Sequence, residues 1–125
     1  MVAYSFKRRF IAPIRNGSKT QTIRKPRPRH ARAGEDLQLY YGMRSPVCAL
    51  IANARCLAVH RIRISFAHID VIAIDGKRIA NKNEFARRDG FADWREMREY
   101  FLRMHDARVF DGVLIRWRLI RRNSR

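Results

Sequence analysis

The stretch from Gly17 to Arg24 holds residue types that can do chemistry, at a spacing that a strand would exploit. Alternation along a strand places Thr20, Thr22 and Arg24 on one face. Lys19 lies at the entrance of that strand. A lysine and hydroxyl groups beside a glycine are residue types found in phosphate-binding loops. The stretch lacks the glycine spacing of a Walker phosphate loop, and an ordinary solvated edge strand remains an open alternative.

Basic side chains form a second group of candidates, suited to phosphate. Arginines on loops and tails reach phosphates without a fixed groove geometry. The candidates on a proline-rich loop and on the C-terminal tail are Lys25, Arg27, Arg29, Arg32, Arg121, Arg122 and Arg125. Beside a glycine turn, Tyr40, Tyr41 and Arg44 can stack on an unpaired base, although a buried tyrosine is the competing expectation. Together these residues predict contact with a single-stranded nucleic acid.

Length and charge bound the class of protein. The chain has 125 residues, which predicts one domain over 1–125 with a basic tail at 119–125. Its net charge is +17, and residues 1–35 hold ten basic side chains against one acidic. Such a surplus predicts a polyanionic partner, to which both basic ends contribute. No apolar run is long enough to span a bilayer, so we expect no membrane contact and a cytoplasmic location.

The cysteines and histidines predict neither a disulfide nor a metal or other cofactor. Cys48 and Cys56 lie in an apolar stretch that favours an extended chain, and we expect both to be reduced and buried. The histidines are scattered, without the short spacings of a metal site. They are His30, His60, His68 and His105.

The elements that must position these residues are short strands with helices in two places. Strands are expected over residues 3–6, 20–24, 37–41, 48–64 (one bent strand or two), 70–75 and 113–120. A brief helix is expected to end before Gly17, and capping boxes at 81–84 and 93–96 to open two more, the first ending at Gly90. The second has an apolar stripe of Trp94, Met97, Phe101 and Met104. The pattern predicts an α+β domain, a small curved sheet or barrel of five to six strands with peripheral helices.

Several blocks in the same order resemble the ASCH domain family. They are Gly17–Arg24, Ala33–Tyr40, Cys56–Ile62, Phe85–Met97 and Phe110–Trp117. ASCH domains belong to the PUA-like superfamily, so the resemblance implies a small β-barrel with peripheral helices. It also implies a cleft that meets nucleic acid or a modified base. Similar members include amidohydrolases that deacetylate acetylated cytidine, ribonucleases and simple nucleic-acid binders, so the family alone does not decide the activity.

The resemblance also implies roles for three residues. In amidohydrolase members a Lys-Thr-x-Thr motif supplies a lysine and a threonine, which correspond here to Lys19 and Thr22. A glutamate of the family corresponds to Asp89, which is one methylene shorter. Lys19 would activate the Thr22 hydroxyl, and Asp89 would carry protons to the leaving amine. A structural role is the competing expectation for Asp89, with Arg24, Arg87 or Arg88 as its ion-pair partner.

The leading prediction is a module that binds RNA, another single-stranded nucleic acid or a modified nucleoside in a cleft around Lys19, Thr22, Arg24 and Asp89. The alternative is a hydrolase, either an acetylcytidine amidohydrolase or a single-strand ribonuclease, using Lys19, Thr22 and Asp89. The charge of +17 favours a polymer over a neutral nucleoside. Recognition of duplex DNA by the helix over 94–104 is disfavoured because that helix carries acidic side chains on its exposed side.

Overall fold

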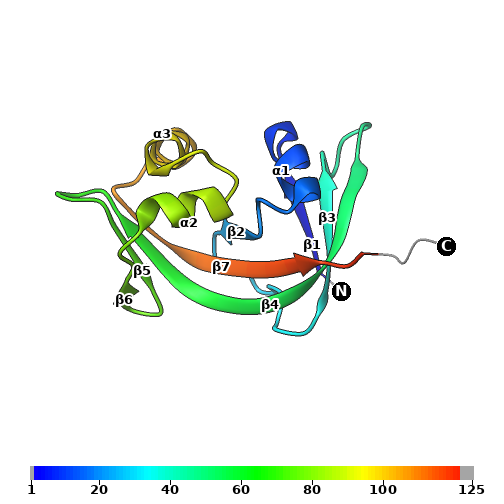
Figure 1. Ribbon diagram of the computed structural model, residues 1–125, viewed down its shortest axis with the longest axis horizontal. Coiled ribbons are helices and arrows are strands. Elements are labelled where there is room, and N and C mark those ends of the chain that lie inside the picture. Colours follow the sequence, from blue (N-terminus) through cyan, green and yellow to red (C-terminus); the bar gives the residue numbers. More distant parts are fainter. Residues whose placement is uncertain (1, 122–125) are drawn as a thin grey trace.

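The computed structural model describes residues 2–121, which form a single curved sheet with its helices on the concave side (Figure 1). The strands are β1 (Val2–Phe6), β2 (Gln21–Arg24), β3 (Asp36–Tyr41), β4 (Ala49–Ser65), β5 (Val71–Ile74), β6 (Lys77–Arg78) and β7 (Val109–Leu119). The helices are the 3-10 turn η1 (Arg8–Phe10), α1 (Ile11–Asn16), α2 (Lys82–Arg88) and α3 (Trp94–Met104). None of these helices has the length and apolar character that crossing a membrane requires.

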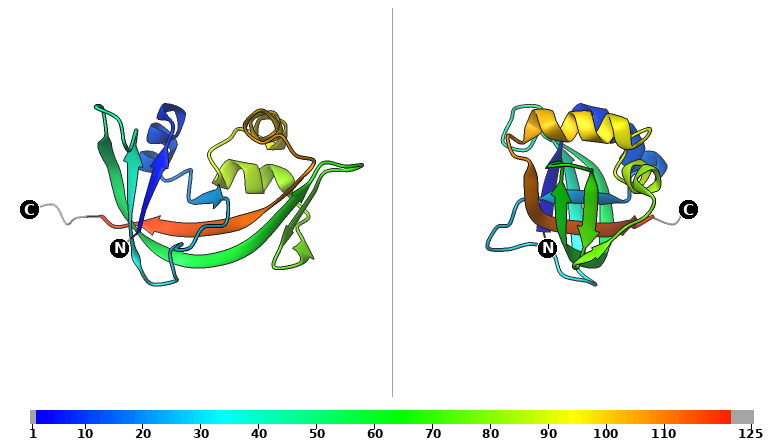
Figure 2. Two further views of the ribbon diagram at one scale, coloured as in Figure 1. Left: turned by 180° about the vertical axis from the view of Figure 1, so that it is seen from behind. Right: turned by 90° about the vertical axis from the view of Figure 1, so that its left-hand side faces the viewer.

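Two long antiparallel strands, β4 and β7, make the floor of the sheet. β2 pairs with β7 on one side, and β3 pairs with the first half of β4 on the other. β1 then joins β3 in parallel, and a ribbon of β5 and β6 continues from the second half of β4. The view from behind shows α2 and α3 over one end of this floor and α1 over the other (Figure 2, left).

The sheet bends because β4 carries an irregularity in each of its main pairings. Its register with β3 shifts between Leu39 and Tyr40, and its register with β7 shifts between Cys56 and Ala58. A β-bulge bends a strand and increases its twist, which curls the sheet around the side chains of its concave face. The expected segment 48–64 is therefore one bent strand.

The domain is α+β, as the sequence predicts, but the predicted barrel is not confirmed. β1, β2 and β6 are the edge strands of the curved sheet, and within residues 2–121 no backbone ladder joins β1 to β2. A side chain crosses the gap instead, because Arg24 Nη2 donates a hydrogen bond to the backbone oxygen of Ser5 at 2.7 Å. We call this gap between β1 and β2 the seam. A seventh strand, the two-residue β6, was not expected.

The structure confirms the N-cap residues of the two predicted capping boxes, but only one of the two hydrogen bonds of each box forms. Asn81 and Asp93 cap α2 and α3, each accepting a hydrogen bond from the backbone N–H three residues on, at 2.9 Å. The return bond of a capping box does not form. Glu84 pairs with Arg88, and Glu96 accepts from the backbone of Ala92.

Two burial predictions are wrong, and both concern the ends of elements. Trp94, Met97 and Phe101 of the α3 stripe are buried as expected, but Met104, the last residue of the helix, is 43% exposed because it lines an open cleft. Cys56 is buried within β4, whereas Cys48 is exposed because it precedes β4, whose first two residues are exposed as well. Both thiols are free.

Candidate functional site

Lys19 is a charged side chain with almost no solvent contact, at 2% exposure. It follows α1, where Gly17 takes a φ of +85° and ends the helix as predicted. Its Nζ donates to the backbone oxygen of Asp89 at 2.6 Å and lies 3.6 Å from carboxylate Oδ2 of the same residue. Nζ also lies 4.5 Å from the ring centroid of Phe10. Burial lowers the pKa of Lys19 to about 8, against the opposing effect of the Asp89 carboxylate.

Asp89 caps the C-terminal end of α2, where unpaired carbonyl groups disfavour a negative charge. Lys19 offsets this effect, and Gln21 Nε2 donates to Asp89 Oδ1 at 3.2 Å. Burial raises the pKa of Asp89, while the ammonium of Lys19 acts in the lowering direction. The expectation of an arginine partner is wrong: among the described residues the ion-pair partner of Asp89 is Lys19, and Arg88 pairs with Glu84 one turn earlier in α2.

Lys19 and Asp89 are 70 residues apart in sequence, and a glycine lets them meet. Gly90 takes a φ of +96°, and a Cβ at this position would lie 3.1 Å from Lys19 Cδ and 3.2 Å from Phe10 Cδ1. The left-handed backbone and the missing side chain together leave room for the lysine. The turn after α2 therefore positions the ion pair.

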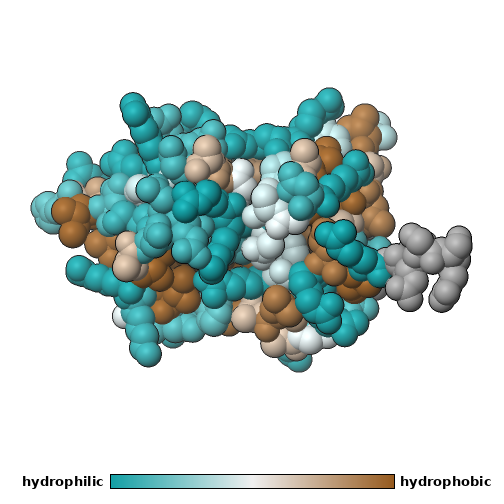
Figure 3. All heavy atoms as spheres, in the orientation of Figure 1, coloured by the Kyte–Doolittle hydropathy of each residue, from teal (hydrophilic) through white to brown (hydrophobic). Residues whose placement is uncertain are grey.

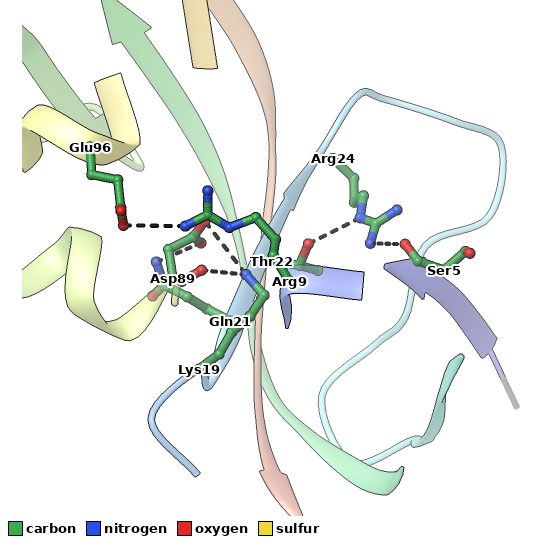
Figure 4. A network of polar contacts seen from close by, with 8 residues as sticks. All are labelled: Ser5, Arg9, Lys19, Gln21, Thr22, Arg24, Asp89 and Glu96. Carbon is green, nitrogen blue, oxygen red and sulfur yellow. Dashed lines mark hydrogen bonds and ion pairs between the residues drawn. The ribbon is translucent and has the colours of Figure 1, made fainter. Parts of the chain in front are cut away.

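Thr22 and Arg24 lie on one face of β2, as the alternation predicts. Arg24 Nε donates to Thr22 Oγ1 at 3.0 Å, and the Arg24 guanidinium carbon lies 4.8 Å from the ring centroid of Phe6 and 5.3 Å from that of Tyr4. Burial lowers the pKa of Arg24. Figure 4 shows Thr22 between two polar groups, with Lys19 and Asp89 on one side and Arg24 and Ser5 on the other.

These side chains line a cleft of about 350 Å³ between the seam and α3. Its polar lining includes Lys19, Thr22, Arg24 and Asp89, so the structure brings together the four residues on which the leading prediction rests. Its aromatic lining comes from five phenylalanine and tyrosine rings of η1, α3 and their neighbours, namely Phe6, Phe10, Phe91, Tyr100 and Phe101. A cavity of this size, largely apolar with a few polar groups, has the character of a small-molecule site.

Beside the cleft, Arg9 packs on three of its aromatic side chains. Its guanidinium carbon lies 4.7 Å from the ring centroid of Phe91 and 5.4 Å from that of Tyr100. Its Nη2 also lies 3.2 Å from a carboxylate oxygen of Glu96 on α3. Arg9 therefore joins η1 to α3 beside the cleft.

Some cationic side chains of the proline-rich loop are exposed to solvent, and others contact groups of the protein itself. Lys25 is exposed and lines the cleft. Arg32 is exposed, and Arg27 packs over Tyr4 with 4.7 Å between the guanidinium carbon and the ring centroid. Arg29 instead forms an ion pair with Glu35, which competes with any phosphate for its guanidinium.

The remaining predicted contacts lie outside the cleft lining. Tyr41 is half-buried, and its hydroxyl accepts from Arg8 Nη2 at 3.2 Å, so one face of its ring is covered. Arg44 is exposed in the turn before β4, with a φ of +66°. Arg121 is exposed just after β7, on a separate cavity of about 250 Å³. The predicted contacts Arg122 and Arg125 lie outside the described residues.

Sequence reasoning missed Gln21 and Ser5. Alternation along β2 assigns Gln21 to the face opposite Thr22, yet it is fully buried and contacts Asp89 because α2 packs there. Ser5 takes part through its backbone oxygen, which leaves no signal in residue type. Within residues 2–121 no group of three His, Cys, Asp or Glu side chains is placed to hold a metal ion.

No family model, curated protein or solved structure matches this chain. The resemblance to ASCH domains therefore stays a prediction.

Proposed function

We propose that this chain is an ASCH-like module that binds RNA, or another single-stranded nucleic acid, by admitting one base or modified nucleoside into the cleft. The observation that carries the proposal is the buried Lys19–Asp89 pair in a cavity of about 350 Å³ with aromatic lining. A base needs apolar faces for its ring and polar groups for its edge, and the cleft offers both. The exposed side chain of Lys25, at the cleft, is suited to contact the phosphate backbone of the nucleic acid.

The same proposal extends to the fold. The open sheet corresponds to a PUA-like barrel whose closure is incomplete at the seam, where the bond from Arg24 to Ser5 replaces a backbone ladder. The cleft lies at this gap, so incomplete closure supplies the opening for a ligand. The two free thiols and a nucleic-acid partner fit the cytoplasm as its location.

Binding of labelled single-stranded RNA and DNA at two salt concentrations tests the proposal. Lys25→Gln removes a charge at the cleft, and Lys77→Gln removes the same charge from exposed β6. We expect Lys25→Gln to weaken binding about tenfold, the loss of one charge-assisted hydrogen bond, and Lys77→Gln to have a much smaller effect. Equal effects of the two variants would place the interface elsewhere on the surface.

A second candidate function is amide hydrolysis on acetylated cytidine. It is favoured by the pKa of Lys19, about 8, which would let this amine act as a base near neutral pH. In the described chain, however, Nζ bonds to Asp89, and no hydrogen bond joins it to Thr22. A substrate would have to move the Lys19 amine from Asp89 toward Thr22 before hydrolysis could occur. We therefore prefer binding to hydrolysis as the proposed function.

Deacetylation and RNA cleavage are measured on the same protein samples. Thr22→Val removes the candidate nucleophile, and Thr20→Val makes the same change two residues away, outside the cleft lining. A hydrolase would lose turnover only in Thr22→Val. If the wild-type protein turns over neither substrate, the hydrolase candidate fails.

A further inference from the structure

The charges that line the cleft do not balance. Four cationic side chains line it, and the single carboxylate among them is that of Asp89; the cations are Lys7, Lys19, Arg24 and Lys25. Lys19 already holds the Asp89 carboxylate, at 3.6 Å. The cleft therefore has a surplus of positive charge at its floor as well as at its rim.

Arg24 carries the part of this surplus that is hardest to explain structurally. Among the described residues, no carboxylate lies within ion-pair distance of its guanidinium; its two hydrogen bonds go to the neutral oxygens of Thr22 and Ser5. The guanidinium also packs on the rings of Tyr4 and Phe6, which limits its hydration. Arg24 is half-buried, and partial burial without an ion-pair partner disfavours the charged form, which lowers the pKa of Arg24.

The bonds that Arg24 makes hold its side chain in place without using all of its donors. A guanidinium has five N–H groups in a rigid fork. One bond from Nε and one from Nη2 fix the plane, and further N–H groups are left to bind a ligand. A fixed fork with spare donors matches the paired oxygens of a phosphate.

We infer that the ligand of this cleft carries a phosphate group that Arg24 binds, so that the cleft selects a nucleotide over the corresponding neutral nucleoside. This inference rests on the proposed function, whose base or nucleoside it extends by a phosphate. The base lies toward Lys19 and Asp89, and the phosphate lies toward Arg24 and Ser5, on the two sides of Thr22 (Figure 4). Lys25 adds a second cation for the same group.

Calorimetric titration with cytidine, cytidine 5′-monophosphate, cytidine 3′-monophosphate and inorganic phosphate tests this inference. At least one nucleotide should bind about tenfold more tightly than cytidine or more, the gain from one charge-assisted bidentate contact. Oligonucleotides with a 5′-phosphate and a 5′-hydroxyl distinguish a terminal phosphate from an internal phosphodiester. Inorganic phosphate should compete with the nucleotide.

Arg24→Gln should abolish the preference for the nucleotide, and Arg24→Lys should retain part of it. Arg95→Gln removes the same charge from an α3 side chain that is 88% exposed, and should leave the preference unchanged. Thermal unfolding of each variant reports whether it is folded. The preference of the wild-type protein tests the inference even if Arg24→Gln does not fold.

Equal affinity for cytidine and both nucleotides would overturn the inference while leaving base binding in place. A preference for the nucleotide that survives in folded Arg24→Gln would also overturn it, because another cation would then bind the phosphate. If no nucleoside, nucleotide or phosphate binds, both this inference and the proposed cleft are wrong, whatever the surface does with RNA.

Discussion

At the scale of single residues, the unusual feature is a lysine and an aspartate that bury each other. Lys19 and Asp89 are 2% and 7% exposed, and each is displaced in pKa toward its neutral form by burial. A buried ion pair is weak evidence for stability, because desolvation opposes the attraction between its charges. A pair at the floor of a cleft is better explained by what it offers a ligand, namely a donor and an acceptor at fixed positions.

The first prediction concerns the pH dependence of stability. The pKa of Lys19 falls from 10.5 in the unfolded chain to about 8 in the folded protein, so between these values the unfolded state binds more protons. The free energy of unfolding therefore gains a contribution that rises with pH from about 8, by at most about 1.4 kcal/mol per pH unit. Below that window both states carry the proton, and the penalty for burying it is fully present.

Urea unfolding between pH 7.5 and pH 9 measures this contribution. Cys56 and Tyr100, whose pKa values burial raises, act with the opposite sign at the upper end. The double variant Lys19→Met with Asp89→Asn keeps these two groups and removes the pair. The wild-type free energy of unfolding should rise relative to the double variant across the range, and parallel curves would show that Lys19 does not titrate there.

At the scale of elements, two helices end alike but in different surroundings. Gly17 ends α1 with a φ of +85°, and nothing lies within 4 Å of a Cβ built on it. Gly90 follows α2 with a φ of +96°, and a Cβ there would press on Lys19 and Phe10. The first glycine serves the backbone alone, whereas the second also keeps space for the site.

Substituting these two glycines separates the two roles. Gly17→Ala should lower the free energy of unfolding by about 1–2 kcal/mol, the strain of a left-handed alanine. Gly90→Ala should lower the free energy of unfolding by about 1–3 kcal/mol more than Gly17→Ala does, because the added methyl group overpacks the site. Binding of single-stranded RNA should weaken only in Gly90→Ala, because only that change moves Lys19. Matching losses in both stability and binding would show that the contact at Gly90 has no effect on the site.

At the scale of the whole molecule, carboxylates are scarce and mostly committed. Ion pairs hold Glu35, Asp36, Glu84, Glu96 and Asp111, among others, to neighbouring arginines. The net charge of +17 leaves many cations without such a partner, which suits a polyanion.

On the face seen in Figure 3, hydrophilic side chains cover most of the surface, and a hydrophobic patch at the right lies over the end of the β3–β4 hairpin. Val47 is 59% exposed in that hairpin.

The third prediction is a steep dependence of nucleic-acid binding on salt. The logarithm of the affinity for single-stranded RNA should fall by about 0.7 per logarithmic unit of salt for each phosphate contacted. Lys25→Gln should make this dependence shallower by about 0.7, the contribution of one phosphate contact. Lys77→Gln should leave the dependence nearly unchanged. Fluorescence anisotropy over a salt series gives these slopes, and an affinity independent of salt would contradict phosphate contact altogether.

The sequence by itself determined the local structure. The caps Asn81 and Asp93, the glycine that ends α1, the apolar stripe of α3 and the shared face of Thr22 and Arg24 were all predictable. Each depends on residues within about one turn of helix or two positions of a strand, where residue type and period decide the conformation.

Only the tertiary structure decided which distant residues meet. It pairs Lys19 with Asp89 across 70 residues, brings Gln21 to the same carboxylate, and leaves the sheet open at the seam that Arg24 crosses to reach Ser5. Such contacts are set by how a curved sheet and its helices pack, and by which charge is desolvated beside which, neither of which a local pattern records. The cleft exists because four separate stretches of chain converge on it.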